Sequence, residues 1–191
     1  MKKIGISGVP GSGKTSLARA LASSCRLDGY KNVELVSEYA REYISKHGLV
    51  ESVWEQCRIT DKQLEWEESV NKKADIMISD SPIYMGFLYA IELVDFSRSK
   101  DVMCYNDLFK KLTKLSNRYD FVVHLNPDIR PVEDDVRQKL HFDENWRQES
   151  NSKLLNIFNM FGQKNVFVII NSDMDERIKT CLNAIRNMSK K

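Results

Sequence analysis

Short apolar runs alternate along the 191-residue chain with longer segments in which apolar residues recur every three or four positions. The longer segments have the period of amphipathic helices, and the short runs are typical of buried strands. The short runs lie at residues 4–6, 33–36, 74–80, 121–125 and 166–170. Strands that alternate with helices predict right-handed β-α-β crossovers. We therefore expect an α/β fold with a five-stranded parallel sheet that is covered by helices on both faces.

The same pattern places the helices and one unusually polar segment. Helices are predicted from Lys14 to near Asp28, from Tyr39 to near Gly48, over residues 52–73, 84–94, 105–116 and 149–161, and after Asp173, with a polar loop at 97–101. Residues 128–148, between the fourth and fifth strands, are rich in Asp and Arg and are poorly suited to a core. We expect a mobile lid there. Because no repeat or linker interrupts the pattern, a single domain over residues 1–191 is expected.

The composition indicates a soluble globular protein but does not identify its binding partner. The chain is 42% hydrophobic and 29% charged, with a formal net charge of +2, which argues neither for nor against nucleic acid. The four cysteines show no C-x-x-C spacing, so reduced thiols are expected rather than zinc or disulfides. There is no signal-type apolar core and no apolar run of membrane-spanning length. These features predict a soluble cytoplasmic protein whose oligomeric state is open.

A phosphate-binding motif follows the first strand. Residues Gly8 to Thr15 read G-x-x-x-x-G-K-T, and a helix is predicted to begin at Lys14. Glycines let successive backbone N–H groups face an anion, and the start of the helix adds its positive dipole end. The cofactor-binding set is Gly8, Gly11, Ser12, Gly13, Lys14, Thr15 and Ser16. The simpler alternative is a glycine-rich turn, but the full motif in its strand-loop-helix context favours a P-loop NTPase fold that binds ATP.

Candidate catalytic groups sit near this motif in the expected sheet. Lys14 would reach the β- and γ-phosphates, and the Thr15 hydroxyl would ligate Mg²⁺. Asp80 ends a buried strand, where a second ligand of that metal is expected; its alternative role is a turn former before Pro82. Glu38 ends the second strand, in a position to accept a proton from an acceptor hydroxyl.

Arginines supply the remaining candidates. Arg41 lies one helical turn after Glu38 and would grip the acceptor; the alternative is an ordinary surface ion pair between the two. Arg137 and Arg147 lie in the polar segment and would stabilise charge on the transferring phosphoryl group. Arg130, in the same segment, is expected to be solvated.

Two further predictions concern the imidazole ring of His124 and the aromatic rings of Tyr39 and Tyr84. His124 lies inside an apolar run, which favours a hydrogen-bonded sheet residue over a ligand. One of Tyr39 or Tyr84 is a candidate for stacking on a base, although aromatic residues at helical spacing are more often core.

With these residues in hand, the chain resembles the NadR-like group of P-loop kinases, which includes ribosylnicotinamide kinase domains and many phage-encoded proteins. The resemblance rests on Gly8–Thr15, Ser37–Tyr43, Asp80–Pro82, Tyr119–Asp120 and Glu133–Arg137, and spans nearly the whole chain. Asp135 stands where the lid motif of the group commonly has glycine. The resemblance implies phosphoryl transfer from ATP to a hydroxyl of a nucleoside-like or nucleotide-like acceptor. Only the kinase half of a bifunctional NadR protein is expected here.

Other acceptors remain open at this point. The spacing from Glu38 to Arg41 is also similar to the acid-x-x-Arg arrangement of phage polynucleotide kinases. That likeness implies a DNA or RNA acceptor, either a 5′-hydroxyl or a hydroxymethylated base, and the host cytoplasm for a phage-encoded protein. A third hypothesis, from another class, is an ATP-driven switch that phosphorylates nothing. The preferred hypothesis is a magnesium-dependent kinase in which Glu38 acts as base, and Asp80 is the alternative base.

Overall fold

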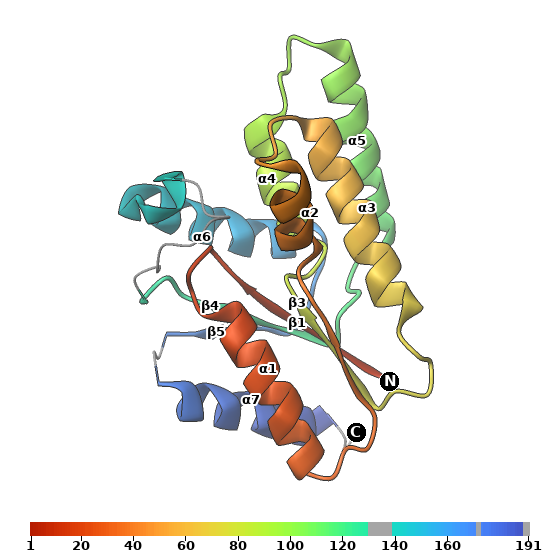
Figure 1. Cartoon of the computed structure of the whole chain (residues 1–191), viewed down its shortest axis with the longest axis vertical. Coiled ribbons are helices and arrows are strands. Elements are labelled where there is room, and N and C mark those ends of the chain that lie inside the picture. The colour runs from red at the N-terminus through yellow and green to blue at the C-terminus, as the bar shows by residue number, and fades with distance from the viewer. Residues whose placement is uncertain (130–138, 171–172, 189–191) are drawn as a thin grey trace.

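Five parallel strands form one sheet in the order β2-β3-β1-β4-β5 (Figure 1). The computed structural model describes residues 1–129, 139–170 and 173–188. The strands are β1 Lys2–Gly8, β2 Val33–Val36, β3 Ile76–Asp80, β4 Phe121–Leu125 and β5 Val166–Ile169. The predicted five-stranded parallel sheet is therefore confirmed, and β1 lies at its centre between β3 and β4.

Helices cover both faces of this sheet (Figure 1). They are α1 Lys14–Leu27, α2 Tyr39–His47, α3 Val53–Ser69, α4 Met85–Leu93, α5 Ser99–Lys114, α6 Glu144–Met160 and α7 Met174–Met188, with a short 3₁₀ helix η1 at Lys139–Phe142. Helices α1 and α7 share one hydrophobic cluster with the sheet, and α3, α4, α5 and α6 share the other. The three-layer sandwich expected for the P-loop NTPase fold is thus present.

The alternation of side chains along the inner strands explains the two clusters. Ile76 and Ile78 of β3 pack with α1 and α7, whereas Met77 faces the opposite cluster. In β4, Phe121 and Val123 belong to the first face and Val122 to the second. Strands β3 and β4 therefore contribute apolar side chains to both helix layers, which explains why their runs are almost continuously hydrophobic.

Two helix starts differ from the predictions. Helix α5 begins at Ser99, inside the predicted loop, because its polar residues lie on the exposed side while Cys104, Leu108 and Leu112 are buried at four-residue intervals. Helix α6 begins at Glu144 instead of residue 149, because Oδ1 of Asp143 accepts the N–H of Trp146 at 2.7 Å and caps the helix. Residues 130–138 of the predicted lid lie outside the described residues, whereas 139–148 form η1 and the start of α6.

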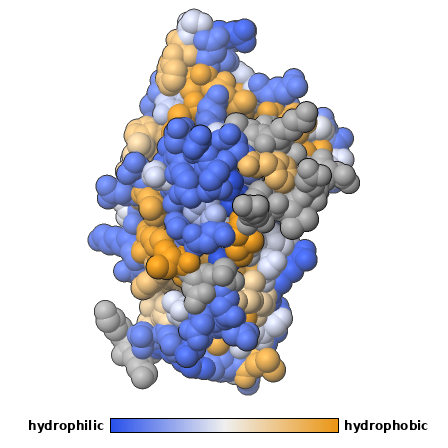
Figure 2. All heavy atoms as spheres, turned by 90° about the vertical axis from the view of Figure 1, so that its left-hand side faces the viewer, coloured by the Kyte–Doolittle hydropathy of each residue, from blue (hydrophilic) through white to orange (hydrophobic). Residues whose placement is uncertain are grey.

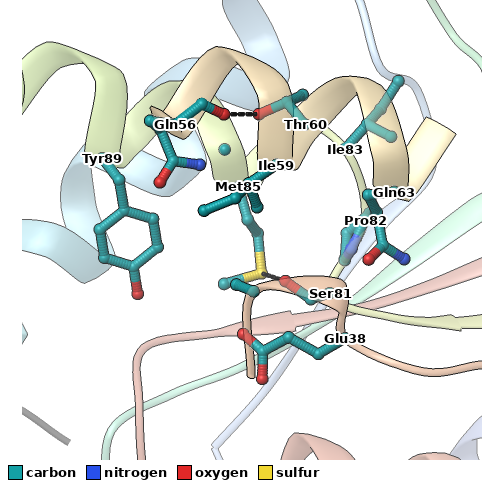
Figure 3. A pocket seen from close by; sticks show the side chains of 12 residues that line it. Glu38, Gln56, Ile59, Thr60, Gln63, Ser81, Pro82, Ile83, Met85 and Tyr89 are labelled. Atoms are coloured by element: carbon teal, nitrogen blue, oxygen red, sulfur yellow. Dashed lines mark hydrogen bonds between the residues drawn. The ribbon is translucent and has the colours of Figure 1, made fainter. Parts of the chain in front are cut away.

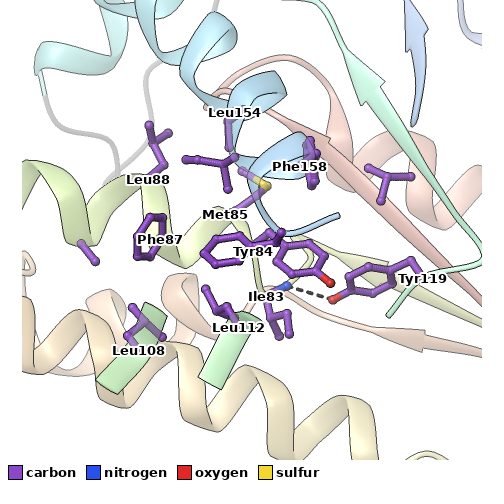
Figure 4. Packing of buried hydrophobic residues seen from close by; sticks show 14 of the residues in the cluster. Ile83, Tyr84, Met85, Phe87, Leu88, Leu108, Leu112, Tyr119, Leu154 and Phe158 are labelled. Carbon is purple, nitrogen blue, oxygen red and sulfur yellow. Dashed lines mark hydrogen bonds between the residues drawn. The ribbon is translucent and has the colours of Figure 1, made fainter. Parts of the chain in front are cut away.

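The turn after β3 is held by a buried polar network. Oε1 of Glu67 on α3 accepts hydrogen bonds from Ser79 Oγ at 2.7 Å and from the Tyr119 hydroxyl at 2.6 Å, and Arg118 Nε donates to Oε2 at 2.9 Å. The Tyr119 hydroxyl in turn accepts the backbone N–H of Ile83 at 2.9 Å (Figure 4). This network fixes the chain on both sides of Asp80.

The same region contains Tyr84, one of the two tyrosines considered for stacking on a base. Tyr84 is fully buried and stacks on Phe161 with ring centroids 5.6 Å apart, within the core drawn in Figure 4. Its hydroxyl donates to the carbonyl oxygen of Leu115 at 2.6 Å. Tyr84 is therefore a core residue, and base stacking by this ring was the wrong prediction. Tyr39 stays half-buried, with its ring edge-on to Trp66 at 4.9 Å.

The four cysteines are free thiols. Although they are distant in sequence, Cys57 on α3 and Cys104 on α5 approach with their Sγ atoms 2.7 Å apart. Across the described ranges, no helix combines the length and apolar character needed to cross a membrane.

Candidate active site

The phosphate loop connects β1 to α1 at the carboxyl edge of the sheet. Its three glycines have positive φ angles of 146° at Gly8, 80° at Gly11 and 90° at Gly13. A Cβ atom at Gly8 would lie 2.5 Å from Ser12 Oγ and 2.8 Å from the carbonyl oxygen of Leu125, so no larger residue fits there. The strand-loop-helix context predicted from the sequence is present.

Lys14 begins α1 and is buried, with Nζ donating to the carbonyl oxygen of Val9 at 3.2 Å. This bond holds the lysine side chain against the backbone of the phosphate loop. Thr15 and Ser16 follow it and line the adjoining cavity. Ser12 is fully buried, and its Oγ has no hydrogen-bond partner among the residues described.

Two buried arginines donate hydrogen bonds to backbone carbonyl oxygens of the phosphate loop. Arg147 of α6 donates from Nη1 to the carbonyl oxygen of Pro10 at 2.6 Å and from Nη2 to that of Ile129 at 2.8 Å. Arg177 of α7 donates from Nη1 to the carbonyl oxygen of Ser12 at 3.0 Å. Both side chains are fully buried, and burial lowers the pKa of Arg177 while the charge of Asp128 opposes that shift.

The observed position of Arg147 differs from the one predicted from the sequence. The sequence suggested a residue of the polar lid, but Arg147 lies on a regular helix and contacts the carbonyl oxygens of Pro10 in the phosphate loop and of Ile129 after β4. The position within a lid was wrong because the cap at Asp143 starts α6 early. Arg177 was not anticipated at all, since its partner lies 165 residues away in sequence. Arg130 and Arg137 lie outside the described residues.

Asp80 ends β3 beside the phosphate loop. Parallel pairing of β1 with β3 sets it opposite Ile6, two residues before Gly8. It is 4% exposed, and Oδ1 is a buried oxygen with no hydrogen-bond partner in the described chain. Ser81, the next residue, has a φ of 87°, a strained value for a residue with a side chain.

The donor set at this edge suits Mg²⁺ in its chemistry. Thr15 offers a hydroxyl and Asp80 a buried carboxylate oxygen, and both are hard oxygen donors. Within residues 1–129, 139–170 and 173–188, no group of three or more His, Cys, Asp or Glu residues could hold a metal by itself. Magnesium bound with nucleotides ordinarily takes few protein ligands and completes its shell with phosphate and water oxygens. The residues present therefore fit that kind of site.

Glu38 and Arg41 stand at the start of α2 and face the same cavity. Arg41 Nε lies 3.8 Å from Glu38 Oε2, which is the ion pair of adjacent helical turns considered from the sequence. Both residues nevertheless line the cavity next to the phosphate loop. Glu38 occupies the N-cap position of α2 but its side chain makes no capping hydrogen bond.

A cavity of about 690 Å³ joins these groups. It extends from Lys14 in the phosphate loop past Glu38 to Tyr89 of α4 and Trp146 of α6. Figure 2 shows this side of the molecule, where hydrophilic side chains dominate and hydrophobic ones form smaller groups between them. A volume of this order accommodates small-molecule ligands.

A smaller cavity of about 30 Å³ continues behind Glu38 (Figure 3). Glu38, Gln56 and Tyr89 line both cavities, and Gln63 and Ser81 line the smaller one. Its lining combines polar and apolar side chains, and its size suits one water molecule or hydroxyl group.

The far wall of the large cavity was not predicted. Trp146 Nε1 donates to Glu92 Oε1 at 3.2 Å, and the rings of His141 and Trp146 lie 5.1 Å apart. Burial raises the pKa of Glu92, and burial followed by the charges of Glu38 and Glu92 raises that of Tyr89. Glu92 and Tyr89 carried only a helical spacing, which core positions share, and His141 and Trp146 lay in the segment predicted to be a polar lid.

His124 is a satisfied residue of β4, as predicted. It is fully buried between Ser7 Oγ at 3.2 Å from Nδ1 and Asn151 Oδ1 at 2.8 Å from Nε2. These partners fit a neutral ring with the proton on Nε2. Burial lowers the pKa of His124 to about 4, and the charge of Lys14 acts in the same direction.

Comparison with known proteins adds a family and a set of similar folds. A family model described as an AAA domain matches residues 3–177. Deoxyadenosine kinase from Dictyostelium discoideum is 25% identical over 165 residues, which are 84% of this chain and 65% of that protein. The chain thus spans slightly less than two thirds of this curated relative.

Solved structures with the same fold have low sequence identity. NadR protein in complex with NR superimposes with a TM-score of 0.75 at 22% identity, covering 97% of this chain and 51% of that one. Deoxyadenosine kinase from M. mycoides, with products dCMP and dCDP bound, gives a TM-score of 0.62 at 17% identity, covering 97% and 99%. At these identities the likeness supports the fold alone.

Proposed function

This chain belongs to the AAA domain family, and we propose that it is a kinase that transfers the γ-phosphate of ATP to a hydroxyl group of a nucleoside-like acceptor. The observation that carries the proposal is that Lys14 of the phosphate loop and the carboxylate residue Glu38 line one cavity. The loop supplies the donor side, and Glu38 supplies a base on the acceptor side.

In the proposed reaction, the acceptor hydroxyl donates a hydrogen bond to Glu38 and loses its proton to that carboxylate. The acceptor oxygen forms a bond to the γ-phosphorus as the bond from that phosphorus to the bridging oxygen of ADP breaks. Lys14 leaves its contact with Val9 and neutralises charge on the phosphates. Mg²⁺, held by Thr15 and Asp80, would offset the remaining negative charge on the β- and γ-phosphates.

The arginines take three roles in this proposal. Arg41, which is about half exposed in its side chain, binds the acceptor. Arg147 keeps the phosphate loop in its binding shape through the carbonyl oxygen of Pro10. Arg137 remains the proposed clamp on the migrating phosphoryl group. The residues proposed to bind ATP are Gly8, Gly11, Ser12, Gly13, Lys14, Thr15 and Ser16.

Two kinds of observation, the lining of the cavity and the names of similar proteins, support a nucleoside acceptor. The cavity beyond Glu38 carries a ring platform at Trp146 and hydrogen-bonding groups at Gln56 and Tyr89, which are the contacts that a ribose and base require. The names of the similar proteins, deoxyadenosine kinase and NadR with NR, point to the same class of acceptor.

A phosphorylated acceptor, free or within DNA or RNA, is the second candidate. Arg19 of α1 is exposed and lines the cavity together with Arg41, so two guanidinium groups face the same space. That arrangement favours an acceptor that carries a phosphate of its own.

The test is a transfer assay with γ-labelled ATP and a panel of nucleosides, nucleotides, nicotinamide riboside and 5′-hydroxyl oligonucleotides. We expect label on a nucleoside. Label on oligonucleotides alone, with binding that falls steeply as salt rises, would favour the nucleic-acid acceptor. Release of labelled phosphate with every acceptor would contradict the proposal and favour an ATP-driven switch.

A further inference from the structure

Gln63 of α3 contacts the backbone on both sides of Glu38. Its Oε1 accepts the N–H of Tyr39 at 2.8 Å, and its Nε2 donates to the carbonyl oxygen of Ser37 at 3.2 Å. The side chain is buried, with 5% of the residue exposed. Gln63 and Glu38 border the same small cavity in Figure 3.

The bond from Tyr39 satisfies a backbone N–H group at the start of α2. Tyr39 is the first residue of α2, so its N–H has no partner within that helix. Glu38 stands at the N-cap position, and its side chain makes no capping hydrogen bond. Gln63 thus satisfies the Tyr39 N–H from another helix, and the Glu38 side chain lines the cavity.

Helix α3 is held in place by several contacts, so the position of Gln63 on this helix is fixed. A capping box between Ser52 and Glu55 closes its first turn. Further along, Thr60 packs against α4 so closely that a Cβ atom at Gly86 would lie 2.1 Å from Thr60 Oγ1. The Tyr39 ring also rests edge-on against Trp66, one turn after Gln63.

We propose that Gln63 is a positioning residue for Glu38, an inference that rests on the proposed function of this site. Gln63 touches neither substrate in this role. It holds the peptide groups that flank Glu38, so that the carboxylate meets the acceptor hydroxyl at the correct distance. Misplacement of a catalytic group by about 1 Å costs on the order of a hundredfold in rate.

The test compares Gln63→Met with a matched control, Gln163→Met. Met keeps the length of the side chain and removes both hydrogen bonds. Gln163 is also buried and also binds backbone on both sides, accepting the N–H of Tyr119 at 3.1 Å and donating to its carbonyl oxygen at 2.7 Å, but it borders neither cavity. We expect Gln63→Met to lower kcat about tenfold to a hundredfold with the KM for ATP within about twofold. Gln163→Met should leave kcat within about twofold.

Two further readouts separate positioning from general loosening. In the Glu38→Gln background, Gln63→Met should reduce kcat by less than about twofold, because its effect passes through the Glu38 carboxylate. Hydrogen exchange at the Tyr39 amide should accelerate about tenfold in Gln63→Met and remain unchanged in Gln163→Met. If Gln63→Met is unfolded at the assay temperature, Gln63→Glu takes its place by the kcat criteria alone, since it keeps the acceptor for the Tyr39 N–H but loses the donor to Ser37.

The outcomes distinguish this inference from the proposed function. An active wild type with unchanged kcat in Gln63→Met would overturn the positioning role and leave the kinase proposal intact. Equal losses in both Gln variants, or full additivity with Glu38→Gln, would also overturn it. A wild type that phosphorylates no acceptor would overturn the proposed function and the role of Gln63 with it.

Discussion

Arg147 Nη1 donates a 2.6 Å hydrogen bond to the carbonyl oxygen of Pro10, joining α6 to the phosphate loop across 137 residues of sequence. The same guanidinium group also bonds to the carbonyl oxygens of Pro127 and Ile129, which follow β4. The shape of the nucleotide-binding loop therefore depends on a helix that begins directly after the η1 turn. A charged donor that serves one buried and two part-buried hydrogen bonds to carbonyl oxygens is costly to remove.

Arg147→Met should weaken nucleotide binding and stability together. We expect the Kd for ATP to rise about tenfold and the free energy of unfolding to fall by about 3 kcal/mol, because three carbonyl oxygens lose a charge-assisted bond. Calorimetric titration with ATP and urea unfolding measure the two effects. Arg58→Met, at an exposed position of α3, is the control and should change neither. Unchanged ATP affinity with a large loss of kcat would instead support the phosphoryl clamp first suggested by the sequence.

Asp80→Asn should separate function from stability. Replacing the carboxylate by an amide weakens a hard-cation ligand, so the Mg²⁺ concentration for half-maximal phosphoryl transfer should rise at least about tenfold. The free energy of unfolding should be unchanged or higher by about 1 kcal/mol, since the substitution removes a buried charge at an oxygen without a hydrogen-bond partner in the described residues.

Asp75→Asn is the matched control for that prediction. Asp75 precedes the same strand at its other end, where Oδ2 accepts the backbone N–H groups of Lys31 and Asn32, each at 3.0 Å. This variant should lose stability by about 1 kcal/mol while its Mg²⁺ response stays at the wild-type value. An Asp80→Asn enzyme with a normal Mg²⁺ response would remove Asp80 from the proposed metal site.

His124 predicts a specific dependence of stability on pH. Its pKa is about 4 in the folded protein and about 6.5 when unfolded, so the unfolded chain binds the extra proton between these values. The stabilisation is complete above pH 6.5 and decreases as pH falls towards 4, by about 3 kcal/mol in total. Urea unfolding at a series of pH values measures this slope. His124→Gln should flatten it, whereas His47→Gln, at an exposed position, should not; equal slopes in all three proteins would contradict the assignment.

Much of the fold was readable from the sequence because each strand and most helices carry a local signal. The strand at Phe121–Leu125 and the helix start at Lys14 follow from apolar runs and from the glycine motif. The start of α6 carried a signal as well, the cap at Asp143, but the surrounding charge favoured a loop. Local capping chemistry outweighed composition there.

The supports of the site could not be predicted in the same way. Gln63 and Arg177 act through backbone groups 24–26 and 165 residues away, and a backbone carbonyl or N–H leaves no mark in the sequence. Glu38 and Asp80 were found because strand ends gather at one sheet edge. Gln63 and Arg177 lie inside helices, where a single polar residue has no distinguishing pattern until the helices are packed.

The most direct test of the account is the transfer rate of Glu38→Gln under saturating ATP and acceptor. Gln keeps the size of the side chain and cannot accept the proton, so kcat should fall by about 10²–10⁴-fold while the Kd for ATP stays within about twofold of wild type. That result would support Glu38 as the base of a phosphoryl-transfer site. A kcat equal to that of the wild type would contradict the central claim, because the carboxylate beside the phosphate loop would then have no part in the chemistry.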